Sequence, residues 1–255
     1  MPVTNFSLEG KVAIVTGGSR GIGRSVAIGL AEAGANVAIA ARKPESLEDA
    51  VSAVNATGRK GVGIPTNVRD LDALQNLVDE TKKQLGRVDI LVNNAATNPV
   101  FGPVHNLDER AWDTIMNTNV KSAFFLSKMV REAILEHGEG GSIINVSSTG
   151  GLRASVGLGG YSVSKAAVIM LTQVCAKQWG TDDIRVNCIA PGLIKTEFSR
   201  ALWENEEILE GSTSGAALQR IGEPDEMAGA VVYFASQASS FVTGQTMVLD
   251  GGGIV

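Results

Sequence analysis

The stretch VAIVTGGSRGIG at residues 12–23 decides the fold of this chain. Its first four residues are apolar, and a glycine-rich turn follows them directly. An amphipathic stretch begins at Ile22, so the segment predicts a buried strand that passes through a tight turn into a helix. Gly17, Gly21 and Gly23 let backbone N–H groups approach a bound phosphate, and the helix N-terminus adds partial positive charge there. The segment therefore predicts a cradle for the pyrophosphate of a dinucleotide.

The spacing of these glycines is G-x-x-x-G-x-G, which differs from the G-x-G-x-x-G commonly found in dinucleotide sites. Glycines that serve only a tight turn between strand and helix are the structural alternative. The position of the turn directly after the first strand favours the cofactor site, because open α/β sheets bind ligands at the carboxyl ends of their strands.

Short apolar runs alternate with amphipathic stretches along the rest of the chain. Nearly continuous apolar runs are typical of parallel strands buried on both faces, and helices between them build right-handed βαβ units. The chain has no linker or break in composition, so we expect one α/β domain over residues 1–255, a Rossmann-like doubly wound sheet flanked by helices. The predicted strands are residues 12–15, 37–40, 61–65, 90–92, 143–146, 186–190 and 247–249. The predicted helices are residues 22–33, 46–56, 71–85, 109–135, 162–179 and 225–235.

The composition excludes several classes of protein. The 22 Lys and Arg residues against 27 Asp and Glu give a net charge of −5, so we expect no nucleic acid as a partner. No run approaches the roughly 20 apolar residues of a membrane span, and the first residues lack the pattern of a signal peptide. Cys175 and Cys188 lie in apolar runs and are expected to be buried free thiols. Since His105 and His137 are the only histidines and lie far apart in the sequence, we expect no metal site. With no predicted signal peptide, membrane span or disulfide, we expect a cytoplasmic location.

The residues after the second predicted strand indicate which dinucleotide binds. An NAD site usually places an Asp or Glu about 20 residues after the glycine turn, where it accepts a hydrogen bond from the ribose. Arg42 and Lys43 stand there instead. Arg42 can pair with a 2′-phosphate through two hydrogen bonds, and Arg20 offers a second cation. The sequence therefore predicts NADP(H) over NAD(H), with solvated surface arginines as the structural alternative.

A second group of residues suggests proton transfer. Tyr161 and Lys165 are four residues apart on a predicted helix and share one of its faces. An adjacent ammonium favours the phenolate, so we expect Lys165 to lower the pKa of Tyr161. Ser148 follows the predicted strand 143–146 and can return to the same site to hydrogen-bond a substrate oxygen. Together, Tyr161 can donate a proton, Lys165 can stabilise its charged form, and Ser148 can polarise a carbonyl group. For Tyr161 and Lys165 taken alone, an exposed pair on the surface of a helix is the structural alternative.

These motifs, taken in chain order, resemble the short-chain dehydrogenase/reductase family over nearly the whole length. The resemblance implies a single Rossmann-like domain with a seven-stranded parallel sheet. It also implies hydride transfer between NADP(H) and a ketone, an aldehyde or a secondary alcohol. The matching positions are 16–23, Asn93, Asn94, Ala95, Ala96, Asn119, Ser147, Ser148, Tyr161, Lys165, Asn187, Pro191, Gly192 and Thr196.

The resemblance also implies a role for each of four catalytic residues. Tyr161 would be the general acid and base, and Ser148 would orient the reacting oxygen. Lys165 would bind the nicotinamide ribose and lower the pKa of Tyr161. Asn119 would hold a water that links Lys165 to solvent, while a buried Asn satisfied by backbone is its structural alternative.

The implied cofactor site draws on the ends of the first four predicted strands and of the sixth, together with the helix that carries Tyr161 and Lys165. Val68 would cover the adenine, Asn93 and Ala95 would flank the adenine ribose, and Ile194 and Thr196 would meet the carboxamide. Two positions depart from the family pattern, with Asn67 in place of Asp and Ala96 in place of Gly; an Asn can still hydrogen-bond the adenine amino group. The full set is Gly17, Ser19, Arg20, Gly21, Ile22, Gly23, Arg42, Asn67, Val68, Asn93, Ala95, Tyr161, Lys165, Pro191, Gly192, Ile194 and Thr196.

Two other functions remain open at this point. A 3-oxoacyl-[acyl-carrier-protein] reductase shares all these motifs but needs a basic patch, for which Arg153, Lys195 and Arg200 are the candidates. A redox sensor without catalysis would have lost a catalytic position, yet all four are present. Residues 197–218 show no strand pattern, and we expect them to form a lid over an apolar pocket for a small carbonyl or alcohol substrate. The resemblance and the apolar stretches 109–135 and 162–179 indicate a homotetramer.

Overall fold

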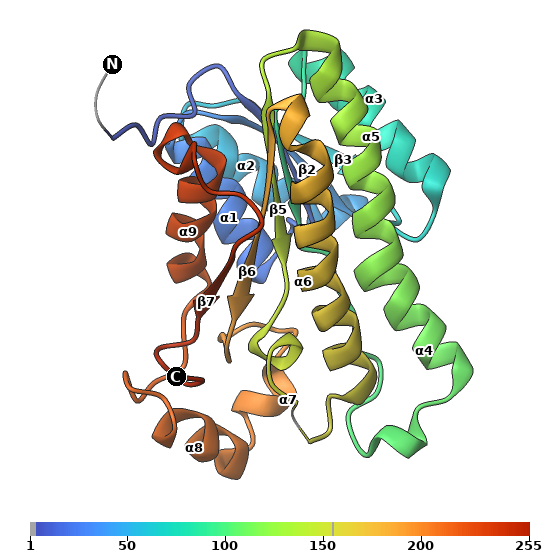
Figure 1. Ribbon diagram of the computed structural model, residues 1–255, viewed down its shortest axis with the longest axis vertical. Helices are drawn as coiled ribbons and strands as arrows, with labels where there is room; N and C mark the ends of the chain where they lie inside the picture. Colours follow the sequence, from blue (N-terminus) through green and yellow to red (C-terminus); the bar gives the residue numbers. More distant parts are fainter. Residues whose placement is uncertain (1–3, 155) are drawn as a thin grey trace.

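The computed structural model describes residues 4–154 and 156–255. Seven parallel strands form one sheet in the order β3-β2-β1-β4-β5-β6-β7 (Figure 1). All seven predicted strands are present, which confirms the predicted doubly wound fold. The strands are β1 (Val12–Thr16), β2 (Asn36–Ala41), β3 (Gly61–Pro65), β4 (Ile90–Asn93), β5 (Gly141–Val146), β6 (Ile184–Pro191) and β7 (Thr246–Leu249).

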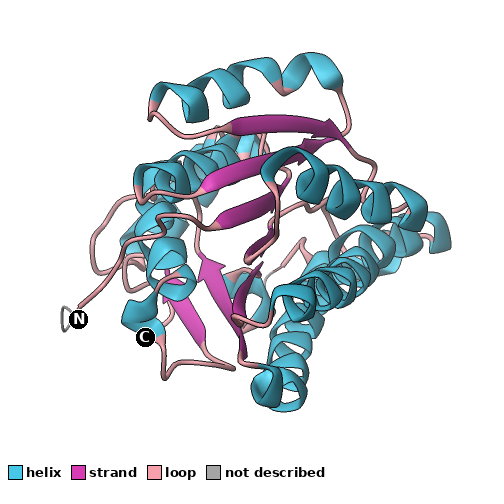
Figure 2. Cartoon of the chain, turned by 90° about the horizontal axis from the view of Figure 1, so that it is seen from above, coloured by secondary structure: helices cyan, strands magenta, loops and turns pink. Residues whose placement is uncertain are grey.

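Helices cover both faces of this sheet, as the view from above in Figure 2 shows. One face carries α1 (Gly21–Glu32), α2 (Glu48–Ala56) and α9 (Ala228–Ala235). The other carries α3 (Leu71–Leu85), α5 (Ser122–His137) and α6 (Gly159–Trp179). Alternate residues of β1 serve the two cores, because Ala13 and Val15 face α1 while Ile14 faces the other side. Burial on both faces explains why the central strands β1, β2 and β4 are nearly continuous apolar runs.

The strand order places the glycine turn at the crevice of the sheet. From β1 the chain moves outward through β2 to β3, then returns to β4, which pairs with the other edge of β1. Ligands of such sheets bind where the order reverses, at the carboxyl ends of the strands. The turn after β1 lies at this point.

The helix predicted over 109–135 is interrupted. It consists of α4 (Glu109–Met116), a π-helical turn (Asn117–Lys121) and α5. Hydrophobic periodicity does not reveal a single widened turn, which is why the sequence predicted one continuous helix. The predicted helix 225–235 likewise begins as a 3₁₀ turn (Pro224–Met227) that continues into α9.

Two short helices lie within residues 197–218, where the sequence predicted a lid without assigning helices. They are α7 (Arg200–Trp203) and α8 (Glu206–Ser214). Asn205 caps α8 by accepting a hydrogen bond from the backbone N–H of Ile208 at 3.0 Å.

Candidate active site

The backbone of the glycine turn is shaped to receive an anion. Gly17 and Gly21 have φ angles of +63° and +52°, in the left-handed region that favours glycine. A Cβ on Gly23 would overlap the carbonyl oxygen of Gly17. Arg20 precedes α1 and makes no side-chain capping bond, so the first N–H groups of the helix are open to a ligand. These features fit a pyrophosphate group.

Asn94 holds this turn against the end of β4. Its Nδ2 donates to the carbonyl oxygens of Thr16 at 2.9 Å and Gly17 at 3.1 Å. The Thr16 hydroxyl accepts from the backbone N–H of Asn94 at 3.0 Å and of Ala95 at 3.1 Å. The sequence analysis assigned neither Thr16 nor the Asn94 side chain to the site, although both lie in its matched motifs.

The side chain of Asn93 points the other way, into the core below α5. Its Nδ2 donates to Ser127 Oγ and Asn145 Oδ1, both at 2.9 Å. Successive side chains of a strand face opposite sides of the sheet, so Asn93 and Asn94 cannot both face the glycine turn. The side chain of Asn93 therefore stabilises the central strands.

Two arginines lie beside the glycine turn without an acidic partner. Arg42 directly follows β2 and is exposed, as is Arg20 within the turn. Among the residues that the structure describes, neither arginine forms an ion pair within 4.0 Å. Both cations are therefore available to a phosphate.

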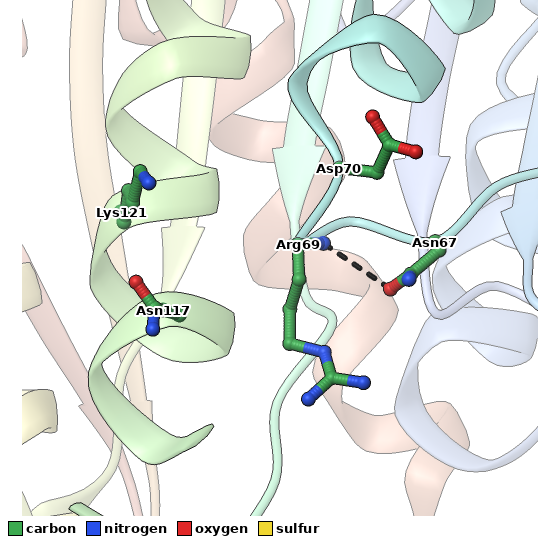
Figure 3. A pocket seen from close by; sticks show the side chains of 5 residues that line it. All are labelled: Asn67, Arg69, Asp70, Asn117 and Lys121. Atoms are coloured by element: carbon green, nitrogen blue, oxygen red, sulfur yellow. Dashed lines mark hydrogen bonds between the residues drawn. The ribbon is translucent and has the colours of Figure 1, made fainter. Parts of the chain in front are cut away.

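The residues after β3 border an open hollow of about 330 Å³. Asn67 and Arg69 lie on one side of it, and Asn117 and Lys121 of the π-helical turn lie on the other (Figure 3). The Asn67 carboxamide accepts a hydrogen bond from the backbone N–H of Arg69 at 3.3 Å. The end of β3 therefore faces the π-helical turn across a solvent-open gap, on the side where the adenine was predicted.

The loop after β6 reaches over the glycine turn. A Cβ on Gly21 would lie 3.2 Å from Cγ2 of Thr196. The backbone of Gly192 donates to Leu249 O at 3.0 Å, and Ile194 is buried beside Gly222. This loop therefore brings Thr196 to the glycine turn, as the predicted cofactor site requires.

Ser148, Tyr161 and Lys165 come together at the end of β5. The Ser148 hydroxyl lies near enough to the phenol of Tyr161 to lower its pKa, and Nζ of Lys165 lies 5.5 Å from the centre of the tyrosine ring. Lys165 is buried and donates to Val146 O at 2.7 Å. Ser147 points away and donates to the backbone carbonyl of Lys165 at 2.7 Å. The arrangement places two hydroxyl groups side by side. The phenol of Tyr161 can exchange a proton with a ligand, and the hydroxyl of Ser148 can orient the oxygen atom that receives it.

Comparison with known proteins identifies the family. Residues 17–253 match the sequence profile described as enoyl-(acyl carrier protein) reductase. Dehydrogenase/reductase SDR family member 4 of Oryctolagus cuniculus is 41% identical over 245 residues, which cover 96% of this chain and 94% of that protein. The chain belongs to the short-chain dehydrogenase/reductase family.

Solved structures of similar proteins share this fold. A 7α-hydroxysteroid dehydrogenase complexed with NADH and 7-oxo glycochenodeoxycholic acid has a TM-score of 0.94 and 31% identity, over 100% of this chain and 98% of that one. Gluconate 5-dehydrogenase from Burkholderia cenocepacia J2315 in complex with NADP and tartrate has a TM-score of 0.93 and 33% identity, over 98% of this chain and 97% of that one. This short-chain dehydrogenase/reductase therefore belongs to a family of oxidoreductases, and two of its structural neighbours have been solved with a nicotinamide dinucleotide bound.

The pKa of Tyr161 differs from the predicted direction. Burial raises it to about 12, and the nearby Ser148 hydroxyl offsets only part of that rise. Burial also lowers the pKa of Lys165 to about 8. The net shift of the Tyr161 pKa is therefore opposite to the predicted lowering, because desolvation of the phenol is the largest cause and Nζ of Lys165 is directed to Val146 O.

Asn119 lies in the π-helical turn of this short-chain dehydrogenase/reductase. Its Oδ1 accepts from the backbone N–H of Thr97 at 2.8 Å, and its Nδ2 donates to Thr97 O at 3.1 Å and to Ser164 Oγ at 2.9 Å. Ser164 in turn donates to the carbonyl of Tyr161 at 2.7 Å. Asn119 therefore connects the loop after β4 to the helix that carries Tyr161 and Lys165, and π-helical turns are frequent at functional sites.

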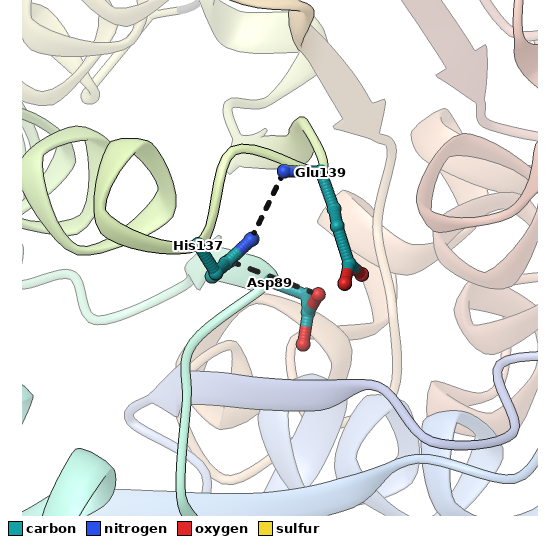
Figure 4. Close-up of side chains that lie close together, drawn as sticks. All are labelled: Asp89, His137 and Glu139. Atoms are coloured by element: carbon teal, nitrogen blue, oxygen red, sulfur yellow. Dashed lines mark hydrogen bonds and ion pairs between the residues drawn. The ribbon is translucent and has the colours of Figure 1, made fainter.

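A separate cluster of potential metal ligands precedes β4. Asp89, His137 and Glu139 lie close together (Figure 4). Arg87 contacts Asp89 at 2.6 Å and Glu139 at 2.7 Å, and Lys11 contacts the same two carboxylates at 3.1 and 3.4 Å. Because two protein cations already neutralise both carboxylates, the cluster is an ion-pair network.

Two further findings concern the chain as a whole. Within residues 4–154 and 156–255, no helix has the length and apolar character that crossing a bilayer requires. Cys175 and Cys188 are buried and free, as the sequence predicted.

Proposed function

We propose that this protein transfers a hydride between NADP(H) and a ketone, an aldehyde or a secondary alcohol. The observation that carries the proposal is the position of buried Lys165 beneath the ring of Tyr161, with the Ser148 hydroxyl beside the phenol. The open N-terminus of α1 at the same edge of the sheet supports it, because this is where a pyrophosphate would bind.

The bound dinucleotide would supply the hydride chemistry. The glycine turn and α1 would hold its pyrophosphate, with Asn67 and Val68 at the adenine and Ile194 and Thr196 at the carboxamide. Tyr161 would give its proton to the carbonyl oxygen of the substrate during reduction and would take a proton back from the alcohol in the reverse reaction. Ser148 would donate a hydrogen bond to the same oxygen, and Asn119 would help to connect Lys165 with solvent.

A pair of tyrosine variants tests this mechanism. The chain has two tyrosines, so Tyr233→Phe on α9 is a matched control for Tyr161→Phe. Loss of the acid should lower kcat by roughly 10²–10⁴-fold, since this is the usual contribution of a positioned general acid, and should leave NADPH affinity nearly unchanged. Wild-type turnover in Tyr161→Phe would refute the mechanism. A wild-type protein that binds NADPH but turns over no carbonyl compound would support a redox sensor instead.

The preference for NADP(H) rests on Arg42 and Arg20. Both are exposed and lie at the end of the site where the 2′-phosphate would bind, and a gluconate 5-dehydrogenase of the same fold is known in complex with NADP. Arg42→Ala should raise KM for NADPH about tenfold or more with little effect on NADH, because hydrogen bonds to charged groups contribute about 1.5–3 kcal/mol. Arg59→Ala, which removes an arginine paired with Glu9, is the control. A wild-type preference for NADH would overturn the assignment.

An acyl-carrier-protein substrate is the second candidate, because the matched profile is described as enoyl-(acyl carrier protein) reductase. Such a carrier needs free basic residues near the site. Arg200, however, pairs with Glu197 at 3.1 Å and with Glu204 at 3.4 Å, and Lys195 lies over the ring of Trp203. Arg153 is exposed and forms no ion pair with the described residues, but one free cation does not make a basic patch. We therefore favour a free small molecule. Faster reduction of a carrier-bound 3-oxoacyl thioester than of any free ketone would reverse this order.

We further propose a cytoplasmic homotetramer in which residues 197–218 act as a lid. Apolar side chains remain exposed on α4 and on the helices that follow it, as subunit contacts require. A stable monomer in light scattering would contradict the tetramer. These exposed residues include Trp112, Phe124, Val163, Met170 and Val174.

A further inference from the structure

Three separate loops at the carboxyl edge of the sheet, the edge that carries Ser148, hold exposed apolar side chains. Phe101 and Val104 follow β4, Leu152 follows β5, and Phe198 follows β6; their exposed fractions are 55%, 64%, 46% and 53%. Large apolar side chains that stay exposed to solvent forgo the free energy that their burial would contribute. A group of them beside a functional site indicates a surface that binds a ligand.

The wall formed by Phe101 and Val104 is fixed to the segment that leads into α6. The backbone of Gly102 donates to Gly157 O at 3.0 Å. A Cβ on Gly157 would lie 2.8 Å from Cζ of Phe101, and a Cβ on Gly159 would lie 2.7 Å from Cγ2 of Val104. These glycines therefore let the two apolar side chains pack directly against the start of the helix that carries Tyr161.

Phe198, from the loop after β6, packs against the ring of Tyr161. Its ring centre lies 6.0 Å from that of Tyr161, with the planes tilted by 42°. One part of the ring is covered by this contact, and the rest is open to solvent.

The position of Phe198 is set by its backbone and not by its own packing. The next residue, Ser199, is buried, and its hydroxyl hydrogen-bonds the carbonyls of Ile194 and Thr196. The indole N–H of Trp203 donates to Thr196 O at 2.9 Å. These bonds hold the loop so that Phe198 projects over Tyr161 even though more than half of its surface is free.

We propose that Phe198 is a specificity-determining residue whose free surface binds a planar apolar substituent next to the reacting carbonyl. This inference rests on the proposed function. Offset or tilted pairs of aromatic rings are stabilised beyond the burial of their apolar area, so a flat aromatic substituent gains more from the free face of Phe198 than a saturated ring of equal size. Arg200 and the nearest carboxylates, Glu197 and Glu204, pair with one another, so the wall presents apolar surface with little net charge.

Two ketones of nearly equal size test the proposal. Acetophenone carries a flat phenyl group, whereas cyclohexyl methyl ketone carries a saturated ring of similar bulk. In Phe198→Ala, kcat/KM for acetophenone relative to cyclohexyl methyl ketone should fall about fivefold, with the larger part of the change in KM. Phe198→Tyr keeps the ring and should preserve the ratio. Phe241→Ala removes a fully exposed phenylalanine between α9 and β7 and should also preserve it.

The outcomes separate this proposal from the proposed function. An unchanged ratio in Phe198→Ala, in an enzyme that Tyr161→Phe inactivates, would overturn the role of Phe198 alone. If the wild type reduces no ketone, the proposed function fails, and ligand-observed NMR of acetophenone then decides the role of Phe198. Weaker binding only in Phe198→Ala would support it. Equal binding by wild type, Phe198→Ala and Phe241→Ala would overturn it and leave a second copy of this chain as the cover of the apolar wall.

Discussion

Replacing Gly23 with alanine tests whether the glycine turn needs its close backbone contact. Alanine is the better helix former by about 1 kcal/mol, so local propensity alone predicts a more stable α1. The structure predicts the opposite. The new methyl group would overlap Gly17 O, which is backbone, and would lie 2.5 Å from Nδ2 of Asn94.

The expected loss has two parts. Forcing a methylene-sized group into a packed region costs about 1–3 kcal/mol. Displacing Asn94 also weakens its two hydrogen bonds to Thr16 and Gly17, each worth about 1 kcal/mol. After the gain in propensity, Gly23→Ala should lose about 2–4 kcal/mol of unfolding free energy, which for a chain of this size lowers Tm by roughly 5–15 °C.

Thermal unfolding followed by circular dichroism, without cofactor, measures this change. Gly211→Ala is the matched control, because Gly211 lies within exposed α8 and a Cβ there would meet nothing within 4 Å. That variant should be as stable as the wild type or slightly more so. NADPH titration by fluorescence should show at least tenfold weaker binding for Gly23→Ala only. A Gly23→Ala protein that melts at or above the wild-type temperature would refute the reasoning.

Three other variants test the surroundings of the site. Burial lowers the pKa of Lys165 to about 8 from 10.5, so the charged form costs stability at pH 7 and the cost fades as pH rises toward 10. The free energy of unfolding of Lys165→Met, measured in urea, should thus be about 2–3 kcal/mol higher than that of the wild type at pH 7 and much closer to it at pH 9.5. A difference between the two proteins that does not change with pH would contradict this. Asp89→Asn should lose about 1–3 kcal/mol, because the charged hydrogen bonds to Arg87 and Lys11 weaken while Glu139 still pairs with both cations, and an unchanged stability would show that the network is dispensable. Trp203→Phe removes the indole donor to the loop after β6 and should speed proteolysis within residues 197–218 at an unchanged Tm; equal cleavage rates would argue against this anchor.

The strands were predictable because parallel strands buried on both faces leave continuous apolar runs. Residues 12–15 and 90–92 are such runs, and both lie inside the observed strands. The π-helical turn at Asn119 was not predictable, since one additional residue in a turn barely changes the pattern of apolar positions. Helix α8 was missed because its nine residues include glycine, serine and threonine, and its apolar pattern is short.

For the candidate site, the sequence predicted which residues stand at the strand ends but not which of their atoms meet. Asn93 and Asn94 look equivalent in the sequence, yet the pleat directs one into the core and the other to the glycine turn. Nothing in the local sequence distinguishes Phe198 from the other residues of 197–218, and only the fold brings its ring beside that of Tyr161. Contacts between loops that are far apart in the sequence depend on how the two core layers place them.

The sequence by itself determined the alternation of strands and helices, the glycine turn after the first strand, and the polar residues at the carboxyl edge of the sheet. These are local properties, since apolar periodicity and glycine conformation act over a few residues. Only the tertiary structure decided the direction of the pKa shift of Tyr161 and the contact of Phe198 with it. Desolvation and packing depend on neighbours supplied by α6 and by the loop after β6, and the spacing of Tyr161 and Lys165 along one helix does not contain them.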